Sequence, residues 1–311
     1  MKKLFKTAIA ATLAAVTTFG FVSCKETTKF TGFDIELSKK VVEYLNETYD
    51  VNLKIEFTEI DWNSKEALLE NGSIDLVWNG MTITPEREEE MCISLPYLYN
   101  KQVAVVRAED KATYTDLASM ANANVGAETG SAGEGVISDQ DIGGEYITAP
   151  SQLDALVSLD NGSIDVAVID LVMAGYYTAN GAYKGKLVIV EDLVLAQEEY
   201  YGIAAKKGNE AFMSKINEAL LALIDTDYKT VAQEFGLTGS CSLSADMVNS
   251  YADATDNSWN EIVSSGKIII GYTVFAPIAY NAKKRNFFRT CLKRLSLNFY
   301  RVLAQRFRCS P

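Results

Sequence analysis

The 311-residue chain contains no histidine. Histidine is the commonest general base and the commonest metal ligand near neutral pH, so its absence argues against both roles. The five cysteines (Cys24, Cys92, Cys241, Cys291 and Cys309) lie far apart, and no two of them have the Cys-x-x-Cys spacing of zinc or redox sites. We therefore expect neither a bound metal nor a cofactor.

Acidic residues are missing from both ends of the chain. Residues 1–23 carry three lysines and residues 283–311 carry nine lysines and arginines, so all 41 acidic residues lie between these two segments. The central part is therefore strongly acidic. Such a body is expected to be soluble and not to bind nucleic acid, because the phosphate backbone would repel it.

The first residues have the character of a targeting segment. Three lysines precede a stretch of apolar and small residues that is too short for a membrane span, which is typical of a signal peptide over residues 1–23. It ends in Phe21-Val22-Ser23-Cys24, which resembles a bacterial lipobox, although Phe21 stands where Leu is usual. The resemblance implies that Cys24 is lipidated and anchors an extracytoplasmic protein to the membrane. The alternative is an ordinary signal peptide followed by an incidental cysteine.

One five-residue sequence occurs twice, because Asn71–Asp75 and Asn161–Asp165 are both Asn-Gly-Ser-Ile-Asp. Each copy follows a helix-like stretch and precedes a short apolar run typical of a buried strand. The Asn-Gly pair supplies the positive φ that ends a helix. We expect one helix–turn–strand unit in each of two lobes, with Gly80 and Asp170 facing a ligand from opposite sides. The alternative is a common αβ-turn that recurs by chance.

Strands and helices alternate along the chain, which predicts an α/β fold of two lobes joined by a two-strand hinge. The local patterns also predict a loop over 80–87 that runs into the start of a helix, a short helix over 114–120 and an aromatic loop over 273–280. The expected segments are a lipidated N-terminus and linker (24–30), lobe I (31–100 and 204–281), lobe II (101–203), a polar linker (239–258) and a basic tail (282–311).

The residues most suited to bind a ligand lie in the stretch 79–87. Gly80 allows the backbone to approach a ligand closely, and Thr82 offers a hydroxyl group. Arg87 offers a planar, two-pronged donor that matches a carboxylate. The alternative for Arg87 is a surface position, because the residues around it are rich in glutamate.

Two further positions complete a possible site. Ser131 and Ala132 lie at an expected helix start, where backbone N–H groups attract an anion. Asp170 lies at an expected strand end and suits an ammonium group, although it could instead cap a helix. One site for an anion and one for a cation, close together, describe a free α-amino acid.

Six short motifs occur in a characteristic order, namely Thr31–Leu37, Asp61-Trp62, Asn71–Asp75, Gly80–Arg87, Leu95-Pro96-Tyr97 and Tyr201–Ala204. In order and spacing they resemble the polar amino-acid-binding receptors of bacterial ABC importers, which have the type II periplasmic-binding fold. The resemblance implies that Arg87, Thr82 and the backbone of Ala132 bind the ligand carboxylate, and that the Gly80 carbonyl and Asp170 bind the ammonium group.

The same resemblance implies a pocket wall. Phe275 would pack on the ligand side chain, with Trp62 and Tyr280 beside it, although Phe275 and Tyr280 could equally be core aromatics. Glu128 lies near the expected ligand-side loop and could bind a cationic side chain, or could simply be solvated.

The order of segments departs from this family. The segment 259–281 resembles the part that normally comes first, directly before Thr31, yet here it comes last. Either the chain is circularly permuted and 267–272 fills the vacant strand position, which we favour, or the C-terminus is a truncated second copy. Residues 283–311 lack a clear helical apolar stripe, so we interpret them as a non-native extension rather than a membrane-docking or permease-docking helix.

These observations favour a monomeric, lipid-anchored, extracytoplasmic receptor that passes a polar amino acid to an ABC permease. Two alternatives differ in class. A cyclohexadienyl-dehydratase-like enzyme on the same fold would need an acid or base in the cleft, for which only Glu128, Glu134 or Asp170 could serve. An amino-acid sensory module would normally continue into a transmembrane helix, and no segment after residue 24 qualifies.

Overall fold

The structure is a computed structural model that describes residues 28–179, 183–190, 193, 195 and 198–283. Residues 30–281 form one compact unit, and the other unit comprises residues 1–29 and 282–311. The predicted signal peptide, Cys24 and nearly all of the basic tail lie outside the described residues. Within the described ranges, no helix combines the length and the apolar character needed to cross a membrane.

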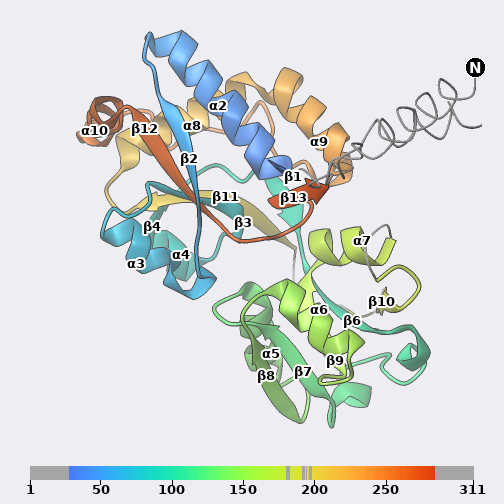
Figure 1. Cartoon of the computed structure of the whole chain (residues 1–311). Coiled ribbons are helices and arrows are strands. Elements are labelled where there is room, and N and C mark those ends of the chain that lie inside the picture. The colour runs from blue at the N-terminus through green and yellow to red at the C-terminus, as the bar shows by residue number, and fades with distance from the viewer. Residues whose placement is uncertain (1–27, 180–182, 191–192, 194, 196–197, 284–311) are drawn as a thin grey trace, which may run out of the picture. The chain divides into compact units, whose positions relative to one another are not determined.

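A six-stranded sheet contains strands from both ends of the described chain (Figure 1). Its strands are β2 (Lys54–Glu59), β12 (Lys267–Tyr272), β3 (Leu76–Thr82), β11 (Glu199–Lys206) and β4 (Met91–Ile93) in that order, with β5 (Leu98–Asn100) paired to β11. β12 is parallel to both β2 and β3, whereas β11 is antiparallel to β3.

Helices cover both faces of this sheet. They are α2 (Phe33–Tyr49), α3 (Lys65–Glu70), α4 (Pro85–Glu90), α8 (Glu210–Ala222), α9 (Lys229–Phe235) and α10 (Ser258–Ser265). All seven residues of β3 are buried. Leu76 and Trp78 pack in the cluster that includes α2 and α8, whereas Val77 packs in the cluster that includes Leu69 of α3. The continuous apolar run of β3 follows from this burial on both faces.

A five-stranded sheet forms the other part of the unit, seen in the lower half of Figure 1. Its strands are β10 (Leu187–Ile189), β6 (Gln102–Arg107), β9 (Val166–Asp170), β7 (Asn124–Glu128) and β8 (Glu145–Ala149) in that order. Its helices are α5 (Ala132–Gln140), α6 (Gln152–Asp160) and α7 (Leu171–Ala179). Ile137 of α5 and Leu156 of α6 belong to separate core clusters, one on each face of the sheet.

The remaining elements are short. They are the strands β1 (Thr28–Thr31) and β13 (Tyr280–Lys283), which pair with each other, the 3₁₀-helices η1 (Trp62–Ser64), η2 (Ala108–Asp110), η3 (Ala118–Met120) and η5 (Thr238–Ser240), and a π-helix, η4 (Ile224–Tyr228).

The two copies of Asn-Gly-Ser-Ile-Asp have the same local structure. Asn71 ends α3 and Asn161 ends α6, and in each copy the asparagine Oδ1 accepts a hydrogen bond of 2.9 Å from the serine N–H. The glycines have φ of 73° and 82°, and both isoleucines are 1 % exposed. The prediction of one helix–turn–strand unit used twice is therefore confirmed.

The last residue of each repeat ties its strand to a parallel neighbour. Asp75 donates its N–H to the carbonyl of Ile269 and accepts the N–H of Ile269, and Asp165 makes the same two hydrogen bonds with Asn124. β3 thus pairs with β12 as β9 pairs with β7. The expectation that 267–272 fills the vacant position is met by this pairing, while circular permutation as the origin of the order stays a hypothesis.

The segment after β12 docks on the start of α2. Phe33 donates its N–H to the Pro277 carbonyl at 2.9 Å, and Asp34 donates to the Ile278 carbonyl at 3.1 Å. Gly32 has φ of 143°, and a Cβ there would lie 2.0 Å from the Ile278 carbonyl oxygen, so only glycine allows this approach. The two ends of the described chain are thereby joined.

The expected linker 239–258 is held against the body by hydrogen bonds. Asp256 Oδ2 accepts the N–H of Ala211, and Asn249 Nδ2 donates to the Ser214 carbonyl. These contacts bring α10 and β12 back to the six-stranded sheet. The segment is thus an ordered connection rather than a free tether.

Some local expectations were wrong. The helix start expected within 80–87 is confirmed by α4, but residues 80–82 are strand rather than loop, because β3 continues to Thr82. The expected helix over 114–120 reduces to η3. The expected aromatic loop is confirmed over 273–279, and only its last residue, Tyr280, belongs to a strand, β13. Pairing with β11 and β1, which lie far away in the sequence, lengthens β3 and creates β13.

The two glycines of the repeated turn, Gly72 and Gly162, lead to a prediction about stability. We expect Gly72→Ala and Gly162→Ala each to lower the free energy of unfolding by about 1 kcal/mol, because both need a positive φ although no atom would obstruct a Cβ. Gly135→Ala, in the exposed interior of α5 and equally unobstructed, should instead raise it by about 0.5–1 kcal/mol. Urea unfolding measures all three. Equal effects at the three positions would contradict the turn geometry.

Candidate functional site

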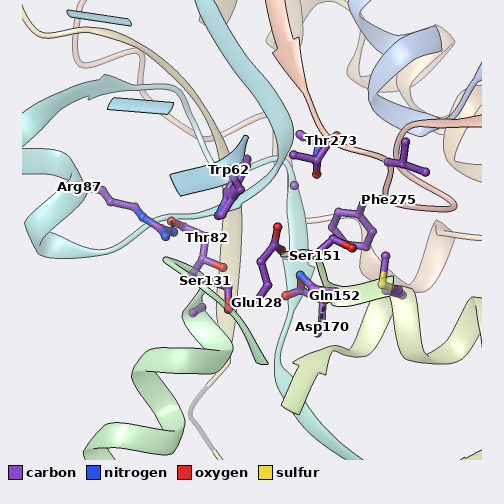
Figure 2. Close-up of a pocket in the computed structure, with 15 residues that line it drawn as sticks. Trp62, Thr82, Arg87, Glu128, Ser131, Ser151, Gln152, Asp170, Thr273 and Phe275 are labelled. Carbon is purple, nitrogen blue, oxygen red and sulfur yellow. Dashed lines mark hydrogen bonds between the residues drawn. The ribbon is translucent and has the colours of Figure 1, made fainter. Parts of the chain in front are cut away.

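One pocket is lined by residues of both sheets (Figure 2). It holds about 410 Å³ of space between atoms, including its opening to solvent. The lining residues are Trp62, Asn79, Gly80, Thr82, Arg87, Thr273, Val274 and Phe275 on the side of the six-stranded sheet, and Glu128, Ser131, Ala132, Ser151, Gln152, Asp170 and Met173 on the side of the five-stranded sheet. Many of these lining residues lie at or just after the carboxyl ends of parallel strands, which is the usual place for a ligand in α/β sheets.

Arg87 is held in position by its helix. Pro85 stands in the first turn of α4, and Thr84 caps the helix by accepting the N–H of Arg87. The Arg87 guanidinium donates from Nη1 to the Thr82 carbonyl at 2.7 Å and from Nη2 to the Gly130 carbonyl at 3.1 Å. Burial lowers the pKa of Arg87, but a guanidinium stays charged at neutral pH. The second hydrogen bond joins the two sides of the pocket.

The start of α5 lies opposite Arg87. Ser131 is the N-cap, and its Oγ accepts the N–H of Glu134 at 3.2 Å. Glu134 in turn accepts the N–H of Gly130 through Oε2 at 2.6 Å, which fixes the loop before the helix. Ser131 and Ala132 line the pocket, so the N-terminus of α5 faces it. Such a helix start favours negative charge.

Asp170 ends β9 and is buried in a cluster of amide groups. Its carboxylate accepts hydrogen bonds from Gln102 Nε2 at 2.7 Å, from Asn100 Nδ2 and from Gln152 Nε2. Glu199 accepts from the same Asn100 and Gln102 side chains. Burial raises the pKa of Asp170, and burial together with the Asp170 charge raises the pKa of Glu199 to about 7. Two carboxylates so close together favour a cation beside them.

Gly80 is fixed by a buried carboxyl group. Its N–H donates to Asp34 Oδ2 at 2.8 Å, and the Tyr97 hydroxyl donates to the same oxygen at 2.8 Å. Burial raises the pKa of Asp34 to about 7. Gly80 has φ of 61°, and a Cβ there would lie 2.9 Å from Phe275 Cε1. Glycine is needed here for both reasons.

The aromatic residues divide into two groups. Phe275 and Trp62 line the pocket, whereas Tyr280 is not among the lining residues and packs against Tyr176, with ring centroids 5.8 Å apart. The expectation for Tyr280 therefore needs correction. It lies on β13, which runs on to pair with β1 and carries the ring away from Phe275.

Sequence reasoning missed part of the lining and the groups behind it. Asn79 was included in the stretch 79–87 but given no role. The missed lining residues are Ser151, Gln152, Met173, Thr273 and Val274, and the missed supporting residues are Asn100, Gln102 and Glu199. Ser151 gave a usable signal, because it precedes a helix and caps it by accepting the N–H of Asp154. The amide side chains gave no such signal, since their contacts with Asp170 depend on which distant segments meet in the fold.

The profile of the bacterial extracellular solute-binding proteins, family 3, matches residues 9–238 of this chain. Among curated proteins, the chain is 32 % identical over 195 residues to the probable histidine-binding protein of Neisseria gonorrhoeae, covering 61 % of this chain and 68 % of that protein. It is 26 % identical over 220 residues to the ABC transporter arginine-binding protein 1 of Escherichia coli K12, covering 69 % and 85 %.

Solved structures agree with this comparison. An ABC uptake transporter substrate binding protein from Streptococcus pneumoniae with bound histidine has a TM-score of 0.60 and 30 % identity, covering 66 % of this chain and 83 % of that one. The arginine-binding protein of Thermotoga maritima (P235GK mutant) has a TM-score of 0.59 and 25 % identity, covering 66 % and 84 %.

The fold and the pocket define a ligand-binding protein of the type II periplasmic-binding fold. The chain belongs to the bacterial extracellular solute-binding proteins, family 3.

Proposed function

We propose that the chain is an extracytoplasmic receptor that binds a free polar amino acid in this pocket and delivers it to the permease of an ABC transporter. The observation that carries the proposal is that Arg87 and Asp170, which stand on different sheets, line one pocket. A guanidinium and a carboxylate on opposite sides match the two charged ends of an α-amino acid. The similarity to a probable histidine-binding protein and to an arginine-binding protein supports this class of ligand.

The carboxylate of the ligand would bind Arg87, Thr82 and the start of α5. Arg87 uses two of its five N–H groups in the hydrogen bonds to Thr82 and Gly130, and a guanidinium can donate further to an anion. The Ala132 N–H adds a backbone donor. The ammonium group would lie against Asp170 and the Gly80 carbonyl, where Asp170 and Glu199 concentrate negative charge.

Ligand binding would favour a closed arrangement of two lobes. The expected boundaries were 31–100 and 204–281 for lobe I and 101–203 for lobe II. Because β11 begins at Glu199 and belongs to the six-stranded sheet, we propose that residues 199–203 are part of lobe I. A ligand that touches both Arg87 and Asp170 has contacts in the closed state that it lacks in an open one. The permease would recognise closure, and no covalent step is needed.

The proposed cellular setting follows from the family and the N-terminus. Members of the family are extracellular solute-binding proteins. We propose further that residues 1–23 are a signal peptide, that Cys24 carries the lipid anchor and that the receptor works as a monomer. A binding role rather than an enzymatic one is in keeping with the relatives, whose names describe binding proteins.

A thermal-shift screen of the common amino acids tests the proposed function. A ligand at 100 times its Kd stabilises the folded state by about 2.7 kcal/mol, which corresponds to a rise in Tm of about 5–10 °C for a chain of this size. We expect such a rise with at least one polar amino acid and none with the matching carboxylic acid that lacks the α-amino group. No shift with any amino acid would contradict the proposal.

A further inference from the structure

Glu128 is a buried carboxyl group that faces the pocket. It ends β7, is 5 % exposed, and its Oε1 has no hydrogen-bond partner among the residues that the structure describes. Figure 2 shows its side chain extending into the pocket between Trp62 and Phe275. Buried carboxylates are costly unless they are paired, so an open acceptor directed at a ligand site needs a partner.

The charged groups around Glu128 do not supply that partner. Lys65 is a buried cation whose charge acts on Glu128, but its Nζ donates to the Trp62 carbonyl at 3.3 Å, pairs with Glu66 Oε1 at 2.9 Å and lies over the Trp62 ring. Arg87 donates to two backbone carbonyls. Asp170 and Asp154 add negative charge, which works against ionised Glu128.

Neither the carboxylate nor the ammonium group of the ligand is expected to contact Glu128. Under the proposed function, Arg87 takes the ligand carboxylate and Asp170 takes the ammonium group. Glu128 then lies beside the space left for the ligand side chain, bordered by the apolar surfaces of Trp62 and Phe275. A flat or extended cation between two aromatic side chains is favourable, and a carboxylate at its end adds a charge-assisted hydrogen bond.

We propose that Glu128 binds the positively charged side-chain group of the ligand, so that the receptor selects basic amino acids over neutral ones. The inference rests on the proposed function and narrows it to one class of ligand. Glu128 is a specificity-determining residue in this account. It is not needed to hold the main-chain groups of the ligand.

Calorimetry with arginine and citrulline tests the proposal, because citrulline replaces the guanidinium with a neutral group of nearly the same shape. We expect wild-type protein to bind arginine about 10- to 100-fold more tightly than citrulline. Glu128→Gln should remove most of that preference by weakening arginine binding, while citrulline binding changes little. Glu145→Gln, an exposed residue on the neighbouring strand β8, should keep the wild-type ratio.

The pH dependence gives a second readout that does not require a variant. Burial, followed by the charge of Asp170, raises the pKa of Glu128 to about 8, whereas Lys65 and the Gln152 N–H oppose the rise. The cationic side chain binds the deprotonated form, so the arginine-to-citrulline affinity ratio should rise from pH 6 toward pH 8.5. Both ligands share the same main chain, so the contacts of that main chain with Asp170 contribute equally to both affinities. Glu128→Gln should make the ratio flat.

The outcomes separate this inference from the proposed function. Equal binding of arginine and citrulline, an unchanged ratio in Glu128→Gln, or tight binding of neutral amino acids only would overturn the role of Glu128 and leave the receptor function standing. Failure of every amino acid to bind would overturn the receptor function itself. If Glu128→Gln does not fold, a pH-independent ratio in the wild-type protein still rejects the proposal.

Discussion

Arg87→Ala should weaken amino-acid binding by at least about 30-fold while the protein keeps its fold. The guanidinium provides the proposed charged contact with the ligand carboxylate, and removing one partner of a buried charge pair typically costs 2–5 kcal/mol in binding. The variant also loses the hydrogen bonds from Arg87 to the Thr82 and Gly130 carbonyls, but Arg87 is only partly buried, so water can replace the donor. Isothermal calorimetry measures the loss, and circular dichroism checks the fold.

Arg107→Ala is the matched control. Arg107 is also a partly buried arginine, but it pairs with Asp110 and Asp165 and donates to the carbonyls of Leu159 and Ile164, away from the pocket. We expect this variant to lose stability and to keep its affinity. Unchanged affinity in Arg87→Ala would remove Arg87 from the site.

Deletion of residues 259–281 should abolish cooperative unfolding of the six-stranded sheet. The segment supplies β12, which pairs with a neighbour on each side, so its loss would leave two unpaired edges in the middle of the sheet. It also removes several fully or nearly fully buried side chains, namely Ile268, Ile270, Phe275 and Ile278. Each contributes about 1.5–3 kcal/mol, and their sum approaches the whole stability of a typical domain.

Two controls make the deletion interpretable. Truncation after Lys283 keeps β12 and β13 and should melt like the full chain. A synthetic peptide of residues 258–283, added to the deleted protein, should restore part of the folded signal by filling the position between β2 and β3. Wild-type melting of the deleted protein would instead favour the view that the segment is a truncated second copy with no part in the fold.

The repeat allowed much of the architecture to be predicted. Two identical turns, each followed by a buried run, placed Gly80 and Asp170 after equivalent strands, and the structure puts both beside one pocket. The prediction worked because the turn depends on local chemistry, namely a glycine with positive φ and an asparagine that caps the turn. Residue order along the chain carries that information directly.

The features that the sequence did not predict depend on contacts between residues far apart in the chain. Tyr280 was a candidate for the pocket wall, with a core position as the alternative, but β13 pairs with β1 at the other end of the described chain and the Tyr280 ring packs against Tyr176. Asn100, Gln102 and Glu199 support Asp170 only because β5, β6 and β11 come together near it. Glu128 was noted, yet its significance depends on burial and an open oxygen, which a sequence does not show.

A crystal structure of the protein with its bound amino acid would show both proposed contacts at once. We expect a single ligand in the pocket of Figure 2, with its carboxylate within hydrogen-bonding distance of Arg87 and its ammonium group against Asp170. A ligand that occupies another part of the molecule, or that touches only one of these two residues, would contradict it.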